Sequence, residues 1–179
     1  MIHDPTQEKI FVKPGYIYIR FEPTLLYTVV GSGVVVTVYD RKLRYGGMNY
    51  YLRPIGKSPD QATAYYAFPG IVHLINLFTE SGSVLSDLEA HIFGGAENNA
   101  ADGYIHELAE KNVSIARRIL ELKKVPIIGQ DIGSSRGRKI ALNSASGEIM
   151  VAKVEHIRNE DWYPAVQFEF KPPAADQPE

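Results

Sequence analysis

The sequence predicts an α+β domain, a sandwich in which helices cover mixed, mostly antiparallel sheets. Short runs rich in β-branched and aromatic residues follow one another along the chain, separated by glycine and proline. Only two segments, near 64–80 and 100–124, have the apolar period of a helix. The 179 residues, 45% of them hydrophobic and 22% charged, suit one folded domain with a core of its own.

The strands are expected in two groups, one before and one after the first helix. Residues 34–39 are β-branched almost throughout, which predicts a central strand buried on both faces. Glycines at 31 and 33, at 46–47 and at 94–95 are expected to break or end strands. In chain order, the expected strands span 16–22, 25–30, 34–39, 48–53, 88–93, 125–128, 139–142, 148–154 and 162–170.

Both helices are predicted from spacing. In the first, apolar residues recur at i, i+3, i+4 and i+7 from Ile71 to Phe78. Its secure part begins near Pro69, since proline is tolerated in a first turn, and Gly82 is expected to end it. The second helix keeps the same period and closes on two lysines, which suit a helix C-terminus.

Three stretches are expected along the chain: an N-terminal segment over 1–15, one domain over 16–155 and an extension over 156–179. Within the extension, Trp162 and the alternation of apolar and polar residues through Phe170 predict an added edge strand or a dimer contact. The remainder, from Lys171, is rich in proline and acidic residues and is expected to be disordered.

Composition excludes several functions. The net charge of −2 gives no reason to expect nucleic-acid binding, and no apolar run approaches the roughly 20 residues of a membrane span. The chain has no cysteine, so it has no disulfide, thiolate metal site or cysteine nucleophile. No two of its five histidines have the helical spacing of metal ligands. We expect a cytoplasmic protein without metal, cofactor or membrane insertion.

The glycine-rich turn at 31–33 does not match two familiar motifs. A dinucleotide fingerprint would require a glycine at Val36, followed by a helix rather than a strand. A nucleophile elbow around Ser32 would require glycines at Val30 and Val34. The turn and Gly94–Gly95 nevertheless fall at strand ends, where a backbone can approach a ligand closely.

Several motifs occur together in one order: TVVGSGVVVTVYD at 28–40, GGMNYYLRP at 46–54, HIFGGA at 91–96, EKNV at 110–113, QDIG at 130–133 and GRK at 137–139. In this order and spacing they resemble the CheD family of chemotaxis proteins, over about residues 16–155. The resemblance implies a three-layer α/β sandwich, similar to the catalytic domain of the cytotoxic necrotizing factor toxins. It also implies the activity of a chemoreceptor glutamine deamidase, with a chemoreceptor cytoplasmic domain or a CheC-type phosphatase as partner.

The chain departs from this family at the catalytic positions. The family nucleophile, a cysteine directly after Gly-Ser, falls on Gly33, and the family base, a histidine, falls on Tyr50. A family threonine falls on Tyr27, with Thr28 adjacent to it. Glycine has no side chain, and tyrosine is a poor base near neutral pH because a phenol ordinarily ionises near 10.

Three hypotheses follow. The first is a catalytically silent CheD-like protein that binds a chemoreceptor or a CheC-type phosphatase. Its former cleft would be either open to a glutamine side chain or filled by tyrosine rings. The second is a deamidase that uses Ser32 or Thr28 as a substitute nucleophile, with His91 as base. The third is a structural or regulatory module outside chemotaxis that reuses the fold. The candidate cleft residues are Thr28, Ser32, His91, Gly94 and Gly95.

Overall fold

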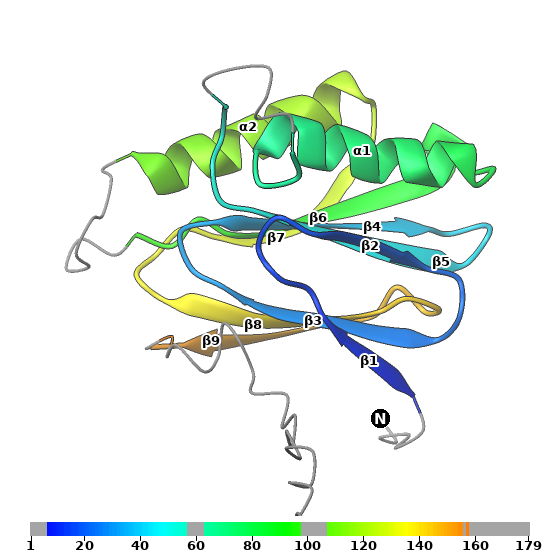
Figure 1. Ribbon diagram of the computed structural model, residues 1–179, viewed down its shortest axis with the longest axis horizontal. Coiled ribbons are helices and arrows are strands. Elements are labelled where there is room, and N and C mark those ends of the chain that lie inside the picture. The colour runs from blue at the N-terminus through cyan, green and yellow to red at the C-terminus, as the bar shows by residue number, and fades with distance from the viewer. Residues whose placement is uncertain (1–6, 57–62, 98–106, 156, 158–179) are drawn as a thin grey trace, which may run out of the picture.

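The computed structural model describes residues 7–56, 63–97, 107–155 and 157. In this part of the chain a pair of α-helices, a five-stranded sheet and a four-stranded sheet are stacked as three layers (Figure 1). The helices are α1 (Ala67–Glu80) and α2 (Leu108–Leu122), and a 3-10 turn, η2 (Leu85–Asp87), follows α1. The strands are β1 (Glu8–Phe11), β2 (Ile17–Arg20), β3 (Thr24–Val30), β4 (Val34–Asp40), β5 (Tyr45–Tyr51), β6 (Leu88–Gly94), β7 (Ile127–Ile132), β8 (Gly137–Asn143) and β9 (Ile149–Val154). The α+β fold predicted from the sequence is confirmed.

The middle layer is the sheet β2-β5-β4-β6-β7, in which only β6 and β7 are parallel. Its central strand, β4, is buried on both faces at every position except Tyr39, as its β-branched sequence predicts. One face of this sheet packs on the helices, and the apolar period of α1 supplies much of that core. The helix residues in the core include Ile71, Leu74, Ile75 and Phe78 of α1 and Ile119 and Leu120 of α2.

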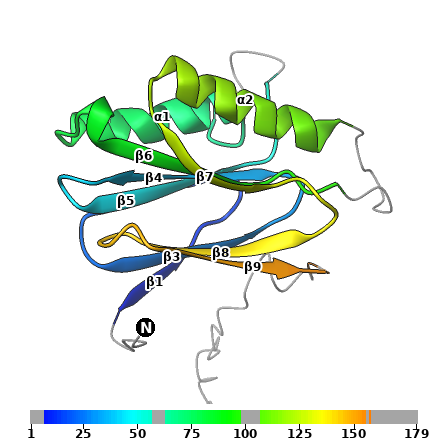
Figure 2. The same cartoon turned by 180° about the vertical axis from the view of Figure 1, so that it is seen from behind.

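The outer layer is the sheet β1-β3-β8-β9, in which β1 and β3 run parallel and the other pairs antiparallel. Alternate residues of its strands point toward the five-stranded sheet and close a second apolar core. Its members are Val12, Leu26, Val30, Val35, Met48, Tyr50, Phe93, Ile140 and Leu142. Seen from behind, both helices lie on the far side of the five-stranded sheet from this layer (Figure 2).

The structure differs from the sequence prediction at three places. β1 was not expected, and it comes from the stretch assigned to the N-terminal segment. Gly46 and Gly47 do not break a strand but lie inside β5, paired on both sides with β2 and β4. A Cβ on Gly47 would lie 2.7 Å from Ile19 Cγ2, so glycine is needed there for close packing. β7 begins at Ile127 and continues through Gln130 and Asp131, beyond the expected end at 128.

The helix boundaries agree well with the spacing. Pro69 lies in the first turn of α1, and Gly82 follows the helix with a φ of +95°. α2 begins at Leu108 within the described residues, while 100–106 of the expected helix lie outside them. The predicted strand at 162–170 also lies outside the described residues. In the described part of the chain, neither helix is long and apolar enough to cross a membrane.

Candidate functional site

Gly33 and Tyr50, the positions expected for a nucleophile and a base, are adjacent in the structure. Gly33 immediately precedes β4, and the antiparallel register of β4 and β5 pairs Val34 with Tyr51 and Val35 with Tyr50. The main chain of Tyr50 is fixed on its other side, where its carbonyl accepts a hydrogen bond of 2.7 Å from the Gly15 N–H. The fold therefore brings together the two positions that the motifs indicate.

The space at Gly33 is already filled. A Cβ built on this buried glycine would lie 2.7 Å from Leu52 Cδ2, 2.8 Å from the Tyr51 carbonyl oxygen and 3.0 Å from Tyr50 Cε2. The Tyr50 side chain is fully buried in the core between the two sheets. The Leu52 side chain, the Tyr51 carbonyl and the Tyr50 ring are thus the atoms nearest to this position.

Gly94 and Gly95 hold the turn at 31–33 against the end of β6. The Gly95 N–H donates to the Gly33 carbonyl at 2.8 Å, and the Ala96 N–H donates to the Gly31 carbonyl at 2.9 Å. Both glycines have positive φ, +110° at Gly94 and +62° at Gly95. A Cβ on Gly94 would meet the Gly33 carbonyl oxygen. These glycines permit two backbones to approach closely, which is the structural role that glycine at a strand end can have.

Asn112 of α2 links the same region to the helices, and the sequence analysis did not identify it as a site residue. Its fully buried Nδ2 donates to the carbonyl oxygens of Ser32 at 3.1 Å and Leu52 at 3.0 Å. The main-chain carbonyl of Asn112 accepts a hydrogen bond of 2.5 Å from the Tyr51 hydroxyl. Its position in the EKNV motif was the available signal. Asn112 thus fixes the two segments that flank Gly33.

Strand alternation separates Tyr27 from Thr28. Tyr27 points to the outer face of the four-stranded sheet, where its ring contacts Phe11 edge to face at 5.4 Å. Thr28 points inward and is almost fully buried, and its Oγ1 donates to the Val12 carbonyl at 2.7 Å. If the family threonine corresponds to Tyr27, the side chain at that position therefore points away from Gly33. Thr28 faces the core, with its hydroxyl hydrogen already donated to the backbone.

No described hydrogen bond joins Ser32 and His91. Ser32 is half-buried beside Gly33, and its carbonyl accepts the bond from Asn112. His91 lies on β6 opposite Thr37, three residues before Gly94. At the rise of a strand, that places it about 10 Å from the glycine. Its ring stacks on Phe93, at a centroid distance of 5.9 Å. We therefore assign no base to Ser32.

Burial governs the electrostatics of the region. Burial raises the pKa of the Tyr51 phenol well above its ordinary value of 10, so this side chain acts as a neutral donor to Asn112. Burial also lowers the pKa of His91, although the nearby Glu89 carboxylate partly opposes this shift. Within the described ranges, no three carboxylate or imidazole side chains are grouped in a way that could hold a metal ion.

Comparison with known proteins adds an independent finding. A family model described as "CheD chemotactic sensory transduction" matches residues 53–153, which is more than half of the chain and begins just beyond Tyr50. A curated protein of Sulfurimonas denitrificans, named a probable chemoreceptor glutamine deamidase CheD, is 36% identical over 151 residues, covering 83% of this chain and 96% of its own. A protein of the same name from Anaeromyxobacter dehalogenans, numbered CheD 1, is 31% identical over 82% of this chain and 85% of its own. One from Geobacter sulfurreducens, CheD 2, is 28% identical over 84% of this chain and 92% of its own.

Proposed function

The chain belongs to the CheD family, and on that premise we propose that it binds a chemoreceptor cytoplasmic domain without deamidating its glutamines. The similar curated proteins are named for action on chemoreceptors, and this favours a chemoreceptor as the partner. A CheC-type phosphatase remains the second partner to test, because the family resemblance implies it.

One observation supports the proposal: Gly33 and Tyr50, on which the family resemblance puts the nucleophile and the base, lie side by side. Deamidation by acyl transfer needs a nucleophile that attacks the side-chain amide carbon and a base that moves protons to the departing ammonia. Gly33 supplies no nucleophilic atom, and a Cβ at this position would collide with Leu52, the Tyr51 carbonyl and the Tyr50 ring. Regaining a thiol would therefore require movement of these neighbours as well as a substitution.

Two hydroxyl groups are the candidates for a substitute nucleophile, and their surroundings argue against both. The Thr28 hydroxyl donates to the Val12 carbonyl and is almost fully buried. Ser32 is more accessible, but no described hydrogen bond joins its hydroxyl to His91. A hydroxyl depends on a neighbouring base more than a thiol does, because its own pKa is far higher. We therefore keep catalysis through Ser32 as an outcome of the experiment and not as a second proposal.

The experiment follows both chemistry and binding with one receptor fragment. Purified protein is incubated with a chemoreceptor cytoplasmic fragment, and glutamine-to-glutamate conversion is read by mass spectrometry and ammonia release. A catalytically intact CheD protein serves as the positive control. Binding of the same fragment is measured by calorimetry, with a CheC-type phosphatase tested in parallel. We expect binding of the receptor fragment and no turnover.

Two variants sharpen the result. The pair Gly33→Cys with Tyr50→His restores both side-chain types, and circular dichroism checks that it folds. Ser32→Ala tests the substitute nucleophile directly. Turnover by the unaltered protein that disappears in Ser32→Ala would contradict the proposal that this protein does not deamidate glutamines. Absence of binding to both the receptor fragment and the phosphatase would remove the proposed role itself.

A further inference from the structure

The outer face of the four-stranded sheet is apolar, and no described element covers it. Figures 1 and 2 show this sheet at the opposite side of the molecule from the helices. Large apolar side chains remain accessible here, and Met150 of β9 is 44% exposed. An apolar sheet face of this kind usually packs against another layer, because antiparallel sheets that face water carry polar residues on that side.

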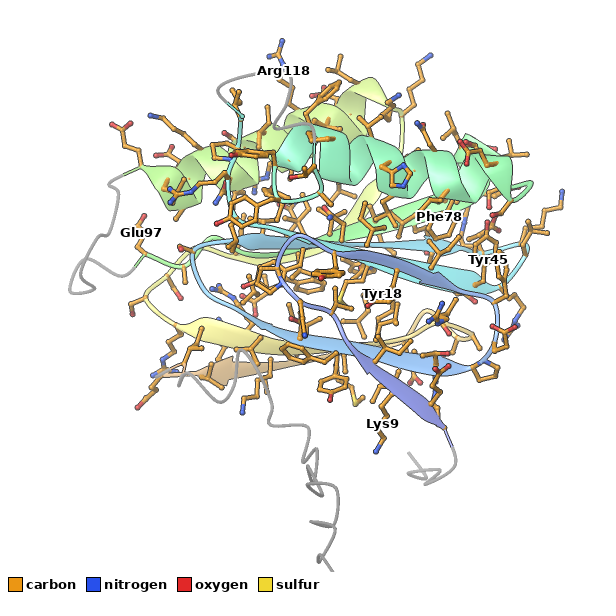
Figure 3. The ribbon with its side chains drawn as sticks, in the orientation of Figure 1. Lys9, Tyr18, Tyr45, Phe78, Glu97 and Arg118 are labelled. Atoms are coloured by element: carbon orange, nitrogen blue, oxygen red, sulfur yellow. The ribbon has the colours of Figure 1, made fainter. Side chains whose placement is uncertain are left out.

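This face is also hollowed. A depression of about 480 Å³ is lined by residues of all four strands, chiefly apolar ones, with lysines from β1 and β8 among them. Figure 3 shows Lys9 pointing outward from β1, away from the five-stranded sheet. The principal lining residues are Lys9, Phe11, Leu25, Tyr27, Val29, Lys139, Ala141 and Met150. The surface thus combines an apolar floor with positive charge.

The chain beyond β9 already turns onto this face. Ile157 packs against Gly137 and Gly31. A Cβ built on Gly137 would lie 2.5 Å from Ile157 Cδ1, and one built on Gly31 would lie 3.3 Å from the same atom. Gly137 shares its face of β8 with Lys139 and Ala141, because side chains alternate along a strand. The last described residue therefore covers one end of the hollowed face.

The remaining chain has the composition to cover the rest. Apolar residues at Val166, Phe168 and Phe170 alternate with polar ones, as in a strand with one apolar side, and Trp162 precedes them. Over 158–179 five acidic residues oppose two basic ones, which complements the lysines of the depression. From Ile157 to Phe170 an extended chain reaches about 43 Å, at about 3.3 Å per residue, which is ample to cross a four-stranded sheet.

We propose that the C-terminal segment, residues 158–179, docks on the outer face of the four-stranded sheet through the apolar residues between Trp162 and Phe170. This interaction is intramolecular, and it is independent of the proposed binding of a chemoreceptor. It makes the outer face a covered surface of the full chain, with its acidic residues near Lys9 and Lys139.

The chain carries its own reporter, because Trp162 is the single tryptophan. Fluorescence of the full chain is recorded with and without acrylamide, a neutral quencher of exposed indoles. We expect a blue-shifted emission that acrylamide quenches several-fold less than free tryptophan. Met150→Glu places an acid on the face without disturbing a core residue, since this side chain is 44% exposed. It is expected to shift the emission to the red and increase quenching.

Two controls keep the result specific. Ile128→Glu alters an apolar residue that is 53% exposed on β7 of the other sheet, and it should leave the tryptophan protected. Dilution over a hundredfold range should also leave the emission unchanged. The proposal would be overturned if Trp162 of the unaltered chain emitted as in water and were quenched by acrylamide as fully as free tryptophan. It would also be overturned if Met150→Glu did not increase the quenching of Trp162. Protection lost on dilution would assign the face to a second copy instead.

Discussion

The ion pair between Arg138 and Asp131 gives the sharpest prediction about stability. These residues come from the GRK and QDIG motifs, and the fold brings them together across the gap between β8 and β7, one strand from each sheet. Arg138 Nη2 and Nε donate to Asp131 Oδ1 at 2.9 and 3.2 Å, and Nη1 donates to the Arg136 carbonyl at 2.6 Å. The Arg138 side chain is fully buried, whereas that of Asp131 is 29% exposed.

Removing the carboxylate leaves a buried guanidinium with one remaining acceptor. Breaking a buried ion pair on one side costs about 3–5 kcal/mol in other proteins, because the surviving charge is desolvated and uncompensated. Water can reach the partly exposed Asp131 side, so we expect Asp131→Ala to lower the free energy of unfolding by about 2–3 kcal/mol. Replacing both residues, as Asp131→Leu with Arg138→Met, should restore stability to within about 1 kcal/mol.

Urea denaturation followed by far-UV circular dichroism measures these differences. Arg136→Ala is the matched control, since Arg136 forms an exposed pair with Glu155 at 3.2 Å and should change stability by less than about 0.5 kcal/mol. If Asp131→Ala is as stable as this control, the pair does not join the sheets as argued. A double variant less stable than Asp131→Ala would refute the reasoning about desolvation.

Three further outcomes are expected. Asn112→Ala should lower the free energy of unfolding by about 2 kcal/mol in urea, because two part-buried carbonyls lose their donor, and a loss of a few tenths would contradict this. The pKa of Tyr51 is raised in the folded protein, so its phenol ionises first in the unfolded chain. The free energy of unfolding should therefore fall as pH rises above about 10. Absorbance titration of the phenol tests this, and Tyr51→Phe should remove the contribution. Gly95→Ala should lower the melting temperature more than Gly82→Ala does. Both have positive φ, but only at Gly95 would a Cβ meet neighbouring atoms, those of Val113.

Much of the fold could be predicted because it depends on local patterns. The β-branched run of β4 and the apolar period of α1 each identify an element without knowledge of the rest of the chain. β1 could not be found this way, since its four residues carry no pattern and its strand state depends on parallel pairing with β3. Gly46 and Gly47 were misread for the same reason, because their place in β5 depends on neighbours on both sides.

The candidate site shows the same division. The motifs placed the expected nucleophile on Gly33 and the expected base on Tyr50, and the absence of cysteine needs no structure to establish. Residue identity alone therefore determined that thiol chemistry is missing. Asn112 could not be recognised, since the two carbonyls that it binds come from residues 80 and 60 positions away in the chain.

Residue identities determined which chemical groups the protein possesses, and local periodicity determined most of its helices and strands. Tertiary structure alone decided that the Tyr50 ring lies against Gly33, that Thr28 faces the core while Tyr27 faces outward, and that His91 lies opposite Thr37. The physical reason is that these relations depend on strand register and on the stacking of two sheets. A shift of one residue in register would reverse the face on which every one of these side chains lies.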